Sequence, residues 1–161
     1  MKARLFSKQT YRTLVLVPGM REIGYAQGVG PLGSSVGVTR WGVRCLPRAT
    51  PPLARISAAR YWLAKVIRSQ EFDQVVVVLP DHAHLCQKKN PTKLGRMARS
   101  LRLQADLMGY PASAQKRTEL KAYRGKPALP AWAPQVPPRA RWAFAALTLP
   151  RNKGGWARRT A

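Results

Sequence analysis

Residues 73–79 read DQVVVVL, an apolar run bounded by polar residues on one side and by Pro80 on the other. A strand covered on both faces lacks the usual alternation of polar and apolar side chains, so this run predicts a central strand of an α/β sheet. A second apolar run, TLVLV at residues 13–17, ends at Pro18 and Gly19 and predicts another buried strand followed by a turn.

The segments around these two strands predict an alternating α/β order. Residues 23–27 and 36–43 alternate loosely on either side of a Gly-rich stretch and predict a hairpin. Two helices are predicted, one opening at Pro51 and Pro52 and one over residues 93–108, the latter stopped by Gly109, Tyr110 and Pro111 before a short strand. A three-stranded meander followed by helices and parallel strands predicts an α/β, ribonuclease H-like mixed sheet with flanking helices. The apolar positions expected to face the core are Leu53, Ile56, Leu63, Val66 and Ile67 in the first helix, and Leu94, Met97, Leu101 and Leu107 or Met108 in the second.

The charge of the chain indicates a polyanionic partner. The 161 residues include 29 Lys and Arg but 6 Asp and Glu, for a net charge of +23. Such a chain repels itself unless a polyanion neutralises it, so we expect nucleic acid as the partner and no membrane. The scarcity of carboxylates also limits any site that needs several clustered acids. Apolar residues make up 45% of the chain, which argues against a merely disordered basic tail.

The cysteines and the N-terminal residues bear on the compartment. Cys45 and Cys86 are too few for a disulfide scaffold or a four-cysteine zinc site. We expect no secretory signal, because residues 1–13 are polar and basic, and no apolar run approaches the length of a membrane span. We therefore expect an intracellular, reducing compartment, either the cytoplasm or nucleoid, or an organelle matrix.

Composition divides the chain into three expected regions: a basic N-terminal arm at residues 1–10, a domain at 11–126, and a basic, Pro-rich C-terminal tail at 127–161 with a short helix at 140–149. Most of the excess positive charge lies after residue 85, where few acids are interspersed, which favours phosphate contact over an ordinary solvated face. Arginine suits bidentate phosphate binding, and Trp156 in the Gly/Arg-rich end of the tail suits stacking on a base. The candidate nucleic-acid contacts are Arg21, Lys88, Lys89, Lys93, Arg96, Arg99, Arg102, Lys116, Arg117, Lys121, Arg124, Lys126, Arg151, Lys153, Trp156, Arg158 and Arg159.

Four stretches, in order, resemble the RuvC-like Holliday-junction resolvases of the ribonuclease H-like superfamily. They are LVLVPGMREIGYAQ at residues 14–27, residues 51–80, KLGRMARSLRLQADLMGYP at 93–111, and the weaker match of Glu119, Leu120, Lys121 and Gly125. In the family these correspond to a strand that ends in Asp-Pro-Gly, a helix running into a strand that ends in an essential Glu, a Leu-Gly-x-x-Arg helix, and a stretch after the fifth strand. The resemblance implies nucleic-acid binding, and a homodimer or a larger nucleoprotein complex as further expectations.

The departures from the family pattern fall on its catalytic acids. Val17 stands where the first Asp is expected and Val78 where the Glu is expected, and Arg141 and Phe144 would occupy the positions of a final Asp-x-x-Asp pair. The family's nucleases hold two divalent ions between such carboxylates, and valine offers no oxygen ligand. We therefore expect no catalytic residues, no metal and no cofactor, and a catalytically inactive relative that grips structured DNA or RNA.

Several alternatives stay open at this point. Asp81, His82, His84 and Cys86 would share one face if the backbone were extended, which would suit a metal site. Glu22 and Asp81 could act as relocated acids of an active, metal-dependent junction nuclease. The chain could also be a structural RNA-binding subunit of a ribonucleoprotein such as an organellar ribosome.

Overall fold

Five strands form one mixed sheet in the order β3-β2-β1-β4-β7. The computed structural model describes residues 12–30, 37–48, 51–120, 126–129, 133 and 135–148. The first three strands form an antiparallel meander, and β4 and β7 run parallel to β1, as the sequence predicts. The strands are β1 (Arg12–Val17), β2 (Glu22–Val29), β3 (Gly37–Cys45), β4 (Gln74–Leu79) and β7 (Ala112–Lys116).

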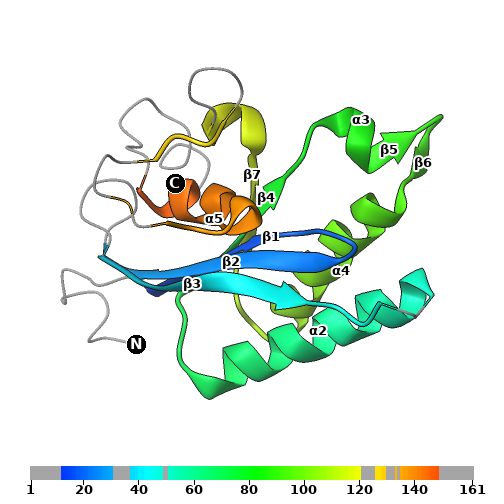
Figure 1. The fold of residues 1–161 in the computed structure, drawn as a ribbon. Coiled ribbons are helices and arrows are strands. Elements are labelled where there is room, and N and C mark those ends of the chain that lie inside the picture. The colour runs from blue at the N-terminus through cyan, green and yellow to red at the C-terminus, as the bar shows by residue number, and fades with distance from the viewer. Residues whose placement is uncertain are drawn as a thin grey trace.

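Helices cover both faces of this sheet (Figure 1). Helices α2 (Pro52–Ser69) and α4 (Lys93–Leu107) lie on one face, and α5 (Pro138–Thr148) lies on the other. Smaller elements connect β4 to α4 and follow β7: α3 (His82–Leu85), β5 (Cys86–Gln87), β6 (Asn90–Pro91) and the 3-10 helix η1 (Arg117–Leu120). Within the described ranges, no helix combines the length and apolar character needed to cross a membrane.

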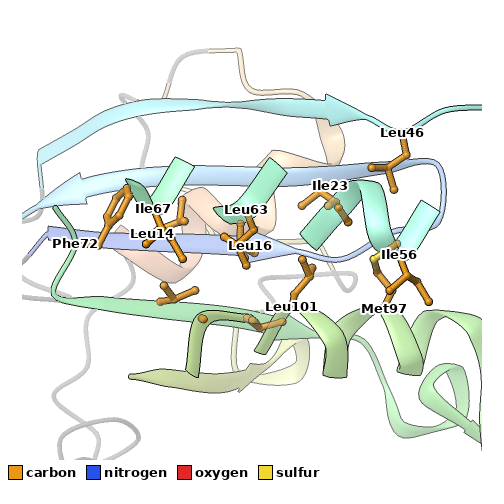
Figure 2. Packing of buried hydrophobic residues seen from close by; sticks show 14 residues of the cluster. Leu14, Leu16, Ile23, Leu46, Ile56, Leu63, Ile67, Phe72, Met97 and Leu101 are labelled. Atoms are coloured by element: carbon orange, nitrogen blue, oxygen red, sulfur yellow. The ribbon is translucent and has the colours of Figure 1, made fainter. Parts of the chain in front are cut away.

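The valine run of β4 is buried because its side chains enter two cores in turn. Val75 and Val77 pack with the inner faces of α2 and α4, together with Leu14 and Leu16 of β1, as Figure 2 shows for the labelled leucines. The alternate residues of β1 and β4 pack against the alanines of α5 on the other face; they are Val15, Val17, Val76 and Val78. The predicted central strand, covered on both faces, is therefore confirmed.

The predicted core positions of the helices hold except at the start of α2. In α2, Ile56, Leu63 and Ile67 are buried, but Leu53 is 70% exposed because it lies in the first turn, before the first residue that reaches the core. In α4, Leu107 is 73% exposed, and Met108 makes the core contact at that end instead.

Part of the segment assigned to the tail packs against the sheet. Helix α5 begins at Pro138, two residues before the predicted start, and buries residues 143–147 against β1, β2 and β4. The arm at 1–10 and the end of the tail from residue 149 lie outside the described residues. The expected three-part division itself stays a prediction.

Candidate nucleic-acid interface

The carboxyl ends of β1, β4 and β7 lie at one edge of the sheet because these strands are parallel. In open α/β sheets, ligands bind outside this edge, where the chain leaves the strands. The turn after β1, the segment after β4, the start of η1 and the first turn of α5 all carry residues that interact there, as described below. We call this region the carboxyl edge.

Val17 and Val78 lie beside each other just inside the carboxyl edge. Leu16 is paired with Val77 in the parallel ladder, so Val17 and Val78 are the next residues along the two strands. Both side chains are fully buried in the apolar cluster that includes Ala143 of α5. The divalent ions implied by the family resemblance need charged oxygen ligands. These residues do not fit such ions, and no group of three or more His, Cys, Asp or Glu able to hold a metal occurs among the described residues.

The two positions matched to the final acid pair lie on different sides of α5. Phe144 is fully buried and packs edge-on against Trp41 of β3, with ring centroids 5.7 Å apart. Arg141 is exposed, and its Nε donates a hydrogen bond to the backbone oxygen of Val136 at 2.8 Å. Neither residue carries a carboxylate, so both agree with the poor fit to a divalent ion.

Arg139, which sequence reasoning missed, reaches the turn after β1. Its Nη1 donates to the backbone oxygen of Pro18 at 3.2 Å, and its Nε lies 3.5 Å from Oε1 of Glu22. The close approach depends on Gly24, where a Cβ would lie 2.7 Å from the backbone carbonyl of Arg139. The signal in the sequence was the pair Gly19 and Gly24, since glycines in and beside strands often permit close backbone approach.

Arg117, a predicted contact, lies half-buried at the start of η1. Its guanidinium carbon lies 5.1 Å from the centre of the Trp142 ring. Burial lowers the pKa of Arg117, the charge of Arg139 lowers it further, and Asp81 acts in the opposite direction. Two guanidinium groups therefore interact at the carboxyl edge, partly balanced by Asp81 and Glu22.

A cleft of about 680 Å³ opens on one side of Arg139. Its lining includes Arg21, Arg48 and Arg55 together with Glu22, so four guanidinium groups face one carboxylate. Arg55 is held by the backbone oxygens of Pro47, Met20 and Arg48, and it thereby ties α2 to the β1–β2 turn and to the segment after β3. The cleft is therefore cationic, and one of its arginines has a bracing role.

Most of the other predicted cations in the described residues lie on the β5–β6 hairpin and on α4. Lys88 and Lys89 form the turn of the β5–β6 hairpin, which extends away from the sheet in Figure 1. Thr92 ties α3 to the start of α4, because its hydroxyl donates to His84 O at 2.6 Å and accepts from Gly95 N at 3.0 Å. Exposed cations are Arg21, Lys88, Lys89, Lys93, Arg96, Arg99, Arg102, Lys116 and Lys126; Lys121, Arg124, Arg151, Lys153, Trp156, Arg158 and Arg159 lie outside the described residues.

The extended backbone required by the alternative metal site is absent. Residues 82–85 form the short helix α3, so His82 and His84 do not alternate as they would in a strand. Glu22 forms an ion pair with Arg139, and Asp81 interacts electrostatically with Arg117. Both acids therefore temper positive charge at the carboxyl edge.

Comparison with known proteins identifies the fold. No protein-family model and no curated protein matches the sequence. The chain is similar to Thermus thermophilus RuvC in complex with a Holliday junction substrate, with a TM-score of 0.65, 16% identity, and coverage of 85% of this chain and 90% of that chain. A second T. thermophilus RuvC structure gives a TM-score of 0.59 at 16% identity, over 83% of this chain and 90% of that one. The yeast mitochondrial Holliday junction resolvase Ydc2 gives 0.49 at 12% identity, over 73% and 57%. The chain thus has the ribonuclease H-like fold in its RuvC-like form.

Proposed function

We propose that this protein binds structured nucleic acid through backbone phosphates and does not cleave it. The observation that carries the proposal is the composition of the carboxyl edge: two buried valines, Val17 and Val78, lie behind two interacting arginines, Arg117 and Arg139. Such an edge favours a phosphate and offers a divalent cation no set of ligands.

The distribution of charge supports phosphate binding. The cationic cleft, the turn of the β5–β6 hairpin and the exposed side of α4 carry most of the predicted contacts within the described residues. Cations that neutralise phosphates release counterions, so binding through them weakens steeply as salt rises. The net charge of +23 would otherwise leave the folded protein under strong self-repulsion.

The shape of the protein supports structured nucleic acid as the ligand. The RuvC structure that resembles 85% of this chain contains a Holliday junction substrate. A four-way junction is therefore the first ligand to test. A structured RNA presents the same backbone chemistry and is the second.

The lack of cleavage follows from the chemistry of metal-dependent nucleases. Their two ions activate water and stabilise the leaving oxygen, and clustered carboxylates hold them in place. Here Val17 and Val78 supply no oxygen ligand, and Glu22 is paired with Arg139. We therefore expect no cleavage in either Mg²⁺ or Mn²⁺.

The test incubates the full chain with an end-labelled four-way junction and separates the products on a denaturing gel, while a parallel titration measures binding. Salt-dependent binding with intact strands is the expected result. Cleavage abolished by Asp81→Ala would contradict the proposal and favour a rebuilt nuclease site. A preference for structured RNA, with retention on ribosomal particles at high salt, would indicate that the same phosphate-binding surface serves a subunit of a ribonucleoprotein.

A further inference from the structure

We propose that Arg117 and Arg139 form a phosphodiester clamp at the carboxyl edge, in which guanidinium groups bind the nucleic-acid backbone without a metal ion. This inference rests on the proposed function and assigns its central contact. It replaces the ion-mediated contact implied by the family resemblance with a direct one.

Among the described residues, Arg139 makes fewer contacts than it has donors. A guanidinium group carries five N–H donors. One Nη of Arg139 binds the backbone oxygen of Pro18, and the Nε ion pair with Glu22 lacks hydrogen-bond geometry at 3.5 Å. Its side chain is 31% exposed, so the group is held in place and still reachable from solvent.

Arg117 presents a second, similarly incomplete set of contacts. Its Nε is buried and has no hydrogen-bond partner within the described part of the chain. The Trp142 ring, 5.1 Å away, supports one side of the guanidinium. A buried donor without a hydrogen-bond partner costs free energy, so the fold leaves this guanidinium group incompletely satisfied.

Helix α5 brings the two arginines to the same place, because Arg139 lies in its first turn and Trp142, three residues further along the helix, contacts Arg117. Burial and the charge of Arg139 both act against the charged form of Arg117, and Asp81 compensates for part of this. A phosphate between them would relieve the repulsion and satisfy the planar donor groups, whose geometry matches phosphate oxygens. The cleft that borders Arg139, with Arg21 and Arg48 in its lining, provides an approach for the adjoining backbone.

Glu22 acts as a competitor in this arrangement. Its carboxylate pairs with Arg139 in the free protein, so a phosphate has to weaken that pair in order to bind. The clamp therefore predicts that Glu22→Gln tightens binding. A role of Glu22 in holding metal would predict the opposite.

The main test compares Arg117→Gln/Arg139→Gln with the control Arg12→Gln/Arg68→Gln. The control removes the same charge from two exposed residues at the start of β1 and the end of α2, away from the carboxyl edge. Binding to labelled duplex DNA, a four-way junction and a structured RNA is measured across a salt series in EDTA. Each lost phosphate contact lowers the duplex salt slope by about 0.9, so the variant that loses the clamped phosphate should lose about 0.9 more than the control.

The outcomes separate the clamp from the proposed function. If the two double variants have equal salt slopes while the wild-type protein binds with a steep slope, the clamp is overturned and the proposed function stands. A wild-type slope near zero overturns the proposed function. If the glutamine variant fails to fold, Arg117→Lys/Arg139→Lys and Glu22→Gln decide. The lysine variant should keep the wild-type salt slope and bind more weakly. Glu22→Gln should bind more tightly than the wild-type protein. Wild-type affinity in both variants would overturn the clamp.

Discussion

Restoring an acid at Val17 should destabilise the fold rather than restore a metal site. Val17 is fully buried among Val15, Val76 and Val78, with alanines of α5 covering it. Keeping an aspartic acid protonated at pH 7 costs about 4 kcal/mol, and pairing with Arg139 at the adjoining turn would offset part of this cost. We therefore expect Val17→Asp to lower the free energy of unfolding by about 2 to 4 kcal/mol at pH 7 through the charge alone.

The matched control is Val17→Asn, which has nearly the same shape and does not titrate. Both variants lose apolar burial and bury a polar group, so their difference isolates the charge. Burial raises the pKa of the introduced carboxyl, so the extra cost is full at neutral pH and disappears as the pH falls toward the ordinary pKa of Asp. Urea unfolding followed by tryptophan fluorescence should show V17D less stable than V17N at pH 7 and equal to it near pH 4. Equal stability at pH 7 would refute the apolar environment assigned to Val17.

Three further predictions concern the packing of α5, the start of α4 and metal. Gly24→Ala should lower the free energy of unfolding in a urea melt by about 1 to 3 kcal/mol, because the new Cβ would lie 2.7 Å from the backbone of Arg139. The control Gly37→Ala, whose Cβ would lie 3.7 Å from its nearest neighbour, should cost much less. Equal losses in the two variants would argue against close packing of α5. Thr92→Ala should cost about 0.5 to 2 kcal/mol by removing the cap on Gly95, while Thr92→Ser should retain most of the stability; similar melts for both variants would contradict the cap. EDTA should leave the Tm unchanged, and a drop reversed by Mg²⁺ or Zn²⁺ would reveal a metal site.

Most of the fold was predictable from local patterns. The valine run of β4 and the Pro-Gly after β1 each determine one element through burial or turn chemistry. The failure lay at the start of α2, where Leu53 continues the apolar periodicity beyond the core. Periodicity reports which side of a helix faces inward, and it does not report where the neighbouring layer ends.

The site was less predictable because its contacts join distant segments. Val17 and Val78 could be identified by position along their strands, since the register between parallel strands follows from the shared fold. Arg139 could not, because its contact with Pro18 spans 121 residues and depends on how closely α5 packs on Gly24. The hypothetical metal site failed for the opposite reason: local alternation of His82 and His84 assumed an extended backbone, and the chain forms a short helix there.

The most direct test of the account follows one four-way junction sample through binding and cleavage together. The junction is titrated with the full chain across a salt series, in EDTA and again in Mn²⁺, and the same samples are run on a denaturing gel. The account predicts salt-dependent binding in EDTA as well as in Mn²⁺, with every strand intact in both. Binding that requires the metal, or strands cut in its presence, would contradict it.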